Sequence, residues 1–399
     1  MRKILLLGGS TQQIPAIEYA KKQGYYTILC DYLPDNPGQH YADKFYCVST
    51  TDREAILEVA QNENVDGIVA YASDPAAPTA AYVAEKMGLP TNPYKSVELL
   101  TNKDKFRMFL AEHNFCTPRA KGYSSIEEAK KDIGRFRLPV FIKPVDSSGS
   151  KGVIKMTDVD NLERNIEYAL SFSRSKRFII EEFVEKYGYQ VAGDGFSVNG
   201  QLVFRCFAND HFNRNGLNSF VPISASFPYN MPRRIHEKIH KEIQRLLNLL
   251  NMKTGAYNFD IRIDEDENVY LMEIGPRNGG NYIPQVTKYA TGVDMVEYTI
   301  KAAMGEDCSG IKMAEPQGYW SYYAVHSCKA GVLKDIRIDE DVKNNNIVES
   351  YLNYMIGDRV PAFLRSDSTI GILIMKFASM NEMLETMDNT KRWIDIVVE

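Results

Sequence analysis

The chain has 399 residues and a formal net charge of −5, with 44% hydrophobic and 25% charged residues. This length is sufficient for two or three domains, and the composition is typical of globular proteins. The acidic balance and the absence of a run of lysine and arginine argue against nucleic acid as a partner. The apolar stretch at 4–7 is too short for a signal peptide, and no later stretch is long enough to span a membrane. We therefore expect a cytoplasmic protein with no membrane partner.

Residues 1–92 alternate short apolar strands with helices, which predicts a parallel sheet covered by helices on both faces. The expected strands are 3–7, 26–30, 45–48 and 67–70, and the expected helices are 14–23, 53–62 and 76–87. Gly8-Gly9-Ser10 and Asp31 follow the first two strands, as in dinucleotide sites. Gln13 fills the third glycine position of that motif, so an NAD-type oxidoreductase is the less favoured alternative. Asp74 is either a substrate contact or the cap of the next helix.

A strand at 140–143 ends in Lys143 and leads directly into a loop of serines and glycines at 146–152. Small side chains leave the backbone N–H groups of such a loop accessible, while a lysine supplies a compact positive charge. Gly149 and Gly152 permit positive φ or close approach of a ligand. The loop therefore predicts a phosphate site, although an ordinary edge hairpin would have the same local pattern.

Two strands at 255–263 and 269–278 are joined by an acidic turn and place Asp260 and Glu273 on neighbouring strands. Carboxylates that face each other across a hairpin repel unless a cation lies between them. Mg²⁺ commonly binds one or two protein carboxylates together with nucleotide phosphates. A lysine with a glycine loop and a nearby pair of carboxylates is the outline of an ATP site.

Taken in order, these motifs resemble the ATP-grasp superfamily, in particular its carboxylate–amine ligases related to carbamoyl phosphate synthetase and biotin carboxylase. The resemblance covers about residues 1–310 and implies ATP and Mg²⁺, with Mn²⁺ as an alternative ion. It implies phosphate contacts by Lys103, Lys143, Ser147, Ser148, Gly149, Ser150 and Gly152. It also implies that Glu181, Glu182 and Val184 border the adenine, and that Asp260 and Glu273 bind the metal. Arg277 would face the acyl substrate or its phosphate, which makes Arg277 and Lys143 the expected catalytic residues.

Two positions depart from the pattern of the resembled family. Gly275 stands where an asparagine metal ligand is common, and we expect Asn278 to replace that ligand. The acidic residue that receives the ribose is either Glu185 or Asp194, because Gln190 makes the register ambiguous.

The resemblance, together with the sequence pattern after residue 316, predicts an α/β fold with four parts. These are a Rossmann-like doubly wound domain at 1–92, linker helices with the small ATP-grasp lobe at 93–184, the large lobe at 185–315, and a small α+β domain at 316–399. The last part would complete the acceptor pocket or mediate self-association into a homodimer. The implied function is an ADP-forming ligase that joins a small carboxylate to an amine. A catalytically silent nucleotide-binding module is the main alternative, because Gly275 removes one metal ligand.

Overall fold

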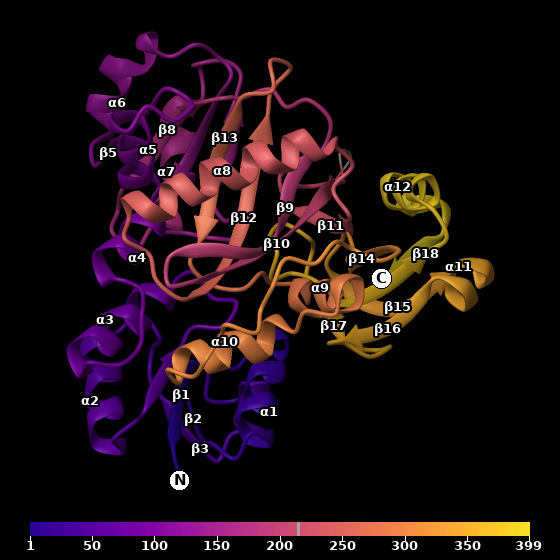
Figure 1. The fold of residues 1–399 in the computed structure, drawn as a ribbon. Coiled ribbons are helices and arrows are strands. Elements are labelled where there is room, and N and C mark those ends of the chain that lie inside the picture. Colours follow the sequence, from indigo (N-terminus) through magenta and orange to yellow (C-terminus); the bar gives the residue numbers. More distant parts are fainter. Residues whose placement is uncertain (214–215) are drawn as a thin grey trace.

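The computed structural model describes residues 1–213 and 216–399, and in these ranges the strands form four sheets (Figure 1). The N-terminal sheet is parallel, in the order β3-β2-β1-β4. Its strands are β1 (Lys3–Leu7), β2 (Tyr26–Asp31), β3 (Lys44–Cys47) and β4 (Gly67–Val69). Helices α2 (Arg53–Glu63) and α3 (Ala77–Met87) cover one face. The other face is covered by α1 (Ile14–Lys22) and α10 (Met295–Ala303). The expected doubly wound sheet is confirmed, and one of its helices comes from a distant part of the chain.

The small lobe contains an antiparallel sheet in the order β5-β8-β6-β7. Its strands are β5 (Ala120–Tyr123), β6 (Val140–Pro144), β7 (Ile154–Met156) and β8 (Phe178–Glu182). Alternation along β6 turns Val140 and Ile142 towards helices α6 (Ile126–Asp132) and α7 (Leu162–Ser171). Phe141 and Lys143 consequently point to the opposite face, where they line a cavity.

The largest sheet has eight strands in the order β13-β12-β9-β10-β11-β14-β18-β16. In chain order its strands are β9 (Gln190–Val198), β10 (Gln201–Phe212), β11 (Pro222–Phe227), β12 (Gly255–Ile263), β13 (Val269–Gly275), β14 (Tyr319–Val325), β16 (Ile347–Leu352) and β18 (Gly371–Phe377). The pairing of β11 with β14 joins Ser224 to Tyr323. The C-terminal part, which we expected as a small separate domain from residue 316, therefore extends the sheet of the large lobe.

The rest of the C-terminal part packs against this extension. A three-stranded sheet contains β15 (Gly331–Ile338), β17 (Arg359–Val360) and β19 (Ile394–Val398). Two helices belong to the same part, α11 (Glu340–Asn345) and α12 (Met380–Asp388). Within the described ranges the short 3-10 helices are η1 (Thr11–Gln13), η2 (Pro37–His40), η3 (Ile133–Arg135) and η4 (Thr390–Arg392).

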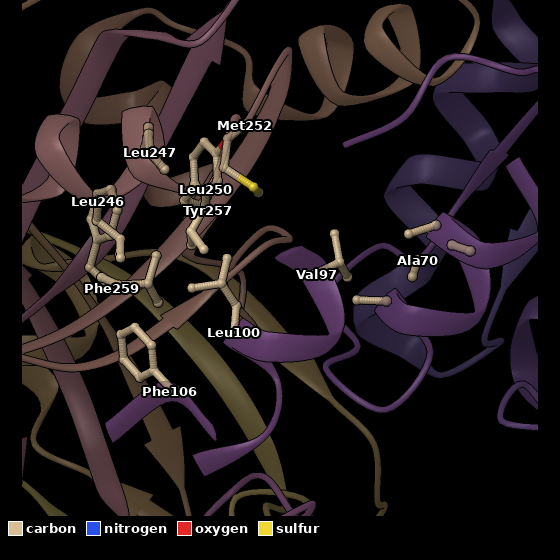
Figure 2. Close-up of a cluster of buried hydrophobic side chains, with 14 of the residues drawn as sticks. Ala70, Val97, Leu100, Phe106, Leu246, Leu247, Leu250, Met252, Tyr257 and Phe259 are labelled. Carbon is tan, nitrogen blue, oxygen red and sulfur yellow. The ribbon is translucent and has the colours of Figure 1, made fainter. Parts of the chain in front are cut away.

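One hydrophobic cluster connects the N-terminal domain to the large lobe (Figure 2). Val97 and Leu100 of α4 (Tyr94–Leu100) and Phe106 of α5 (Lys103–Glu112) lie between the two parts. Leu246 belongs to the apolar face of α8 (Arg233–Leu249), which continues this cluster over the large sheet. Each fully buried side chain of this size contributes roughly 1.5–3 kcal/mol. The cluster fixes the start of α5, and therefore Lys103, relative to β12 and β13.

Helix α9 (Ile283–Thr291) follows the second strand of the acidic hairpin and packs on the large sheet. Within residues 1–213 and 216–399, no helix combines the length and the apolar character needed to cross a lipid bilayer.

Candidate functional site

A cavity of about 560 Å³, which we call the central cavity, lies between the small lobe, the glycine loop at 146–152 and the large sheet. Six of the expected phosphate contacts line it, namely Lys103, Lys143, Ser147, Ser148, Gly149 and Ser150. Asp260 and Glu273 line the same cavity. Gly152 lies behind the loop at φ +73°, where an added Cβ would approach Phe172 and Pro144 at 3.0–3.1 Å. The structure thus gathers one constellation from residues about 170 positions apart in the chain.

Lys143 and Glu181 form a buried ion pair on neighbouring strands of the small lobe. Lys143 Nζ donates to Glu181 Oε1, and Arg107 Nε of α5 lies 3.0 Å from Glu181 Oε2. Burial alone would raise the pKa of Glu181, but the charges of Arg107 and Lys143 outweigh burial and lower the pKa to about 2. Glu181 is therefore ionised at neutral pH and holds Lys143 at the cavity edge.

Asp260 and Glu273 lie directly opposite each other in the β12–β13 ladder, as the sequence predicts. Glu273 Oε2 lies 3.1 Å from Lys103 Nζ, whereas Asp260 Oδ1 has no hydrogen-bond partner among the described residues. Burial raises the pKa of Asp260 to about 6. Burial also acts on Glu273, but the charges of Lys103 and Arg277 lower its pKa. A buried carboxylate oxygen without a partner, beside a second carboxylate, suits a hard divalent cation.

Lys103 connects this carboxylate pair to the glycine loop. Its Nζ donates to the Ser147 carbonyl at 2.7 Å, and its backbone N–H donates to the Val145 carbonyl at 2.9 Å. Gly149 and Ser150 adopt positive φ, at +65° and +58°. The start of the loop is therefore hydrogen-bonded to Lys103, and two consecutive residues further along the loop have left-handed backbone conformations.

The C-terminal part also contacts the glycine loop. Lys151 Nζ lies 2.8 Å from Asp367 Oδ2, and the Ser366 N–H donates to the Gly149 carbonyl at 3.4 Å. No local sequence signal could have shown these contacts, because the partners are more than 200 residues apart.

The three residues expected at the adenine lie behind the cavity wall. Glu181 faces Lys143 and Arg107, and Glu182 accepts a hydrogen bond from the Arg137 N–H at 2.9 Å. The Val184 carbonyl accepts from Arg262 Nη1 at 2.8 Å. The surface of the cavity at this end is aromatic instead and is formed by Phe141, Phe183 and Phe220.

Arg277 and Asn278 are both held by residues outside the carboxylate pair, and for Asn278 this differs from the predicted metal role. Arg277 Nε donates to Asp74 Oδ1 at 2.7 Å, and Nη2 donates to Asp74 Oδ2, so the guanidinium is held bidentately. Asn278 is fully buried, and its Oδ1 accepts a hydrogen bond from Thr299 of α10 at 2.9 Å. In this arrangement Asn278 does not join Asp260 and Glu273, because the turn after Gly275 directs its side chain to α10.

The structure decides against one of the two expectations for Asp74, namely that it caps the next helix, while a substrate contact stays a prediction. The helix that follows it has Ala76 as N-cap, with no side-chain capping bond. Asp74 therefore orients Arg277 rather than capping α3.

The Gly8-Gly9-Ser10 segment does not form an open dinucleotide loop. Gln13 Nε2 donates to the Tyr71 carbonyl at 2.8 Å, and Gln13 Oε1 accepts from the Ser10 N–H at 2.9 Å. An added Cβ at Gly8 would lie 2.3 Å from the Gln13 amide. The Gln13 side chain occupies the space that a pyrophosphate would need, which agrees with the sequence argument against an oxidoreductase.

A second cavity of about 310 Å³, which we call the side cavity, meets the central cavity at the Lys103–Glu273 pair. Both cavities are lined by Lys103, Ser147, Ser148 and Glu273. Asp74, Arg53, Arg174, Asn102 and Gly275 line only the side cavity. Two separate molecules could therefore meet at the carboxylate pair.

Comparisons with known proteins agree with this geometry. Residues 136–285 match the family model described as the ATP-grasp domain. The chain is 27% identical to the carbamoyl phosphate synthase large chain of Pseudothermotoga lettingae, over 80% of this chain and 29% of the relative. The L-amino acid ligase from Bacillus licheniformis has a TM-score of 0.81 and 19% identity, covering 100% of this chain and 99% of that chain. The biotin carboxylase domain of the Hydrogenobacter thermophilus 2-oxoglutarate carboxylase, in complex with MgADP and bicarbonate, has a TM-score of 0.76 and 16% identity, covering 100% and 91%.

The chain spans less than a third of the length of that carbamoyl phosphate synthase chain. The matched segment contains β6, the glycine loop, Asp260 and Glu273. The likeness of fold covers the whole chain, including the part after residue 315. The resemblance stated from the motifs is thus confirmed for residues 136–285, which match the ATP-grasp domain, and carbamoyl phosphate synthases are among the relatives of the chain.

Proposed function

We propose that the chain is an ATP- and Mg²⁺-dependent ligase that activates a substrate carboxylate as an acyl phosphate, which an amine then attacks. In the first step a carboxylate oxygen bonds to the γ-phosphorus, and the bond between that phosphorus and ADP breaks. In the second step the amine nitrogen bonds to the acyl carbon, inorganic phosphate leaves, and the amine proton passes to phosphate or solvent.

The observation that carries this proposal is the arrangement of Lys103, Lys143, Asp260 and Glu273 around one cavity beside the glycine loop. Phosphoryl transfer needs alignment and neutralisation of charge more than covalent help from the protein. Lys143, fixed by Glu181, would contact a phosphate at the strand end, and Lys103 would contact one beside the loop. No nucleophilic side chain is needed in this scheme.

Asp260 and Glu273 are the residues that would hold Mg²⁺, which would neutralise charge on the β- and γ-phosphates when bound. Their donor set fits, since Asp260 Oδ1 is buried and has no hydrogen-bond partner in the described part of the chain. The described residues contain no group of three or more Cys, His, Asp or Glu side chains that could hold a metal. The ion would therefore need phosphate oxygens and water to complete its shell, so it should bind with the nucleotide.

The side cavity is the proposed site of the carboxylate substrate. It opens onto Glu273 and Lys103, where the terminal phosphate would lie, and Arg53 and Arg174 supply positive charge along its wall. Arg277 lies beside it but already binds Asp74, so an acyl group would share this guanidinium with Asp74. A screen of small carboxylates and amines is needed to identify the two substrates.

The test is ADP release from Mg²⁺-ATP by the full chain with pairs of small carboxylates and amines, including the common amino acids. Hydroxylamine in place of the amine should convert the acyl phosphate to a hydroxamate. Glu273→Gln should abolish both products, whereas Glu265→Gln, in the exposed turn of the same hairpin, should leave them unchanged.

Three results would separate the alternatives. Carboxylate-dependent ADP release together with hydroxamate supports the ligase. ADP release that needs no carboxylate contradicts acyl activation. Tight Mg²⁺-ATP binding without turnover across the screen favours the silent module, which the separation of Asn278 from the carboxylate pair would explain.

A further inference from the structure

The C-terminal part supplies an acidic side chain to the central cavity. Asp388 is the last residue of α12, the yellow helix labelled in Figure 1, and it lines the cavity wall. Helix α12 packs on β11 and β14 of the large sheet. This position brings a residue near the C-terminus to the same cavity as Lys143.

Hydrogen bonds from the large lobe hold the Asp388 carboxylate. Tyr189 Oη donates to Asp388 Oδ2 at 2.6 Å, and His211 Nδ1 donates to Oδ1 at 2.7 Å. His211 Nε2 lies 2.8 Å from Ser226 Oγ and accepts from that hydroxyl when the ring is neutral. Burial lowers the pKa of His211, although Asp388 opposes this effect, so the neutral ring is favoured. The His211 side chain is 1% exposed, whereas that of Asp388 is 47% exposed and accessible to a ligand.

Asp388 lines the same cavity as Phe183, Lys143 and the glycine loop, and it is hydrogen-bonded to Tyr189, which lies next to β9. Phe183 lines the aromatic end of the cavity. Further along the chain, Tyr189 and Gln190, at the start of β9, line the cavity as well. The lysines and the glycine loop form the other end. For a nucleotide with its base at Phe183 and its phosphates at Lys143, we expect the ribose to face the part of the cavity that Tyr189, Gln190 and Asp388 line.

We propose that Asp388 accepts hydrogen bonds from the ribose hydroxyls of the bound nucleotide, so that the C-terminal part completes the nucleotide site. An ionised carboxylate only accepts hydrogen bonds, and a vicinal diol offers two donors. The proposal rests on the ATP-dependent function proposed above. It assigns a role to the C-terminal part and makes it a determinant of selectivity for ribonucleotides.

The other carboxylates of this region are less suitable. Asp260 and Glu273 lie at the phosphate end, and Asp210 is 6% exposed and accepts a hydrogen bond from Gln190. The two residues that the sequence suggested for the ribose are placed elsewhere. Asp194 is fully buried, with both carboxylate oxygens bonded to the Gly279 N–H, and Glu185 is exposed to solvent.

The experiment compares the affinities of the full chain for ATP, 2′-deoxy-ATP and 3′-deoxy-ATP by titration calorimetry with Mg²⁺. Wild type should bind ATP at least about tenfold more tightly than one of the deoxynucleotides, as for a hydrogen bond to a charged group. In Asp388→Ala, ATP affinity should fall by about the same factor while affinity for that deoxynucleotide changes little, so that the ratio approaches one. Glu385→Ala, an exposed change on the same helix, should keep the wild-type ratio.

Equal weakening of all three nucleotides in Asp388→Ala would overturn the proposal, because it would show that Asp388 acts only by supporting Tyr189 and His211. Absence of discrimination in wild type would overturn it as well. If Asp388→Ala does not fold, Asp388→Asn takes its place, and a wild-type ratio in that variant counts against the proposal. Failure of wild type to bind any nucleotide would instead contradict the proposed ATP-dependent function.

Discussion

The two walls of the central cavity are built by different means. What we call the strand wall contains Lys143 of the small-lobe sheet and Asp260 and Glu273 of the large sheet, and ladder register fixes the positions of all three. What we call the loop wall is the glycine loop at 146–152. Its conformation is held by single contacts, such as those of Lys103 Nζ with the Ser147 carbonyl and of Lys151 with Asp367. The strand wall therefore holds its charges in place before any ligand arrives, while the loop wall has a conformation that a bound phosphate could reorganise.

The largest effect on stability is expected from the ion network behind the strand wall. Glu181→Gln leaves the Lys143 and Arg107 charges buried without a carboxylate, which should cost about 3–5 kcal/mol of unfolding free energy. Glu182→Gln is the control, since its distant contact with the exposed Arg119, at 3.9 Å, should contribute less than about 1 kcal/mol. Urea titration of both variants measures their free energies of unfolding. Equal losses of stability would show that the strand wall does not depend on this ion network.

The next largest effect concerns catalysis by lysines on the two walls. Lys143→Ala should lower kcat by about 10²–10³, if Lys143 aligns the transferred phosphoryl group. Lys151→Ala removes a loop lysine whose partner Asp367 is 46% exposed, and should lower kcat by less than about tenfold. Steady-state ADP release measures both, and a larger loss in Lys151→Ala would reverse the assigned roles of the walls.

A pH effect should come from Asp194, which lies under the loop that begins at Gly279. Burial raises the pKa of Asp194 from 3.8 to about 6. Because the folded pKa lies above the unfolded value, the folded state binds more protons between about pH 4 and 6, and stability falls as pH rises through this window. The difference amounts to about 3 kcal/mol above pH 6. Asp194→Asn should have a smaller slope than wild type when unfolding is followed by urea titration at several pH values, while the contribution of Asp260, whose pKa is also raised to about 6, should remain. An unchanged slope would exclude Asp194 as a source.

The smallest effect is expected where the C-terminal part holds the loop wall. Asp367→Asn removes a partly exposed ion pair with Lys151, which should change global stability by less than about 1 kcal/mol. Hydrogen exchange should nevertheless be faster in peptides that cover 147–152, and unchanged in peptides that cover β8. Identical exchange in the loop peptides would mean that Asp367 does not restrain the loop.

Local patterns predicted the strand wall well. The hairpin of Asp260 and Glu273 follows from two alternating strands with an acidic turn, so pairing and register come from neighbouring sequence. Phe141 was missed as a cavity residue, although strand alternation could have identified it, because it lies two residues before Lys143 on the same strand face.

Contacts between distant elements could not be predicted in this way. Arg277 is paired with Asp74, 203 residues away, and Asn278 with Thr299 of a helix that packs on the N-terminal sheet. Asp388 meets His211 across 177 residues, through a helix whose periodicity shows only an ordinary amphipathic face. The C-terminal strands were predicted as a separate domain because sequence order does not show that β14 pairs with β11.

The central claim is that Asp260 and Glu273 provide the protein ligands of a nucleotide-bound Mg²⁺. The direct measurement is the affinity for ATP with Mg²⁺ and with EDTA, in wild type and in the double variant Asp260→Asn with Glu273→Gln. We expect Mg²⁺ to tighten ATP binding by wild type at least about tenfold, and to have little effect in the double variant, which should bind metal-free ATP no worse than wild type. An equal enhancement by Mg²⁺ in both proteins would contradict the claim and place the metal elsewhere.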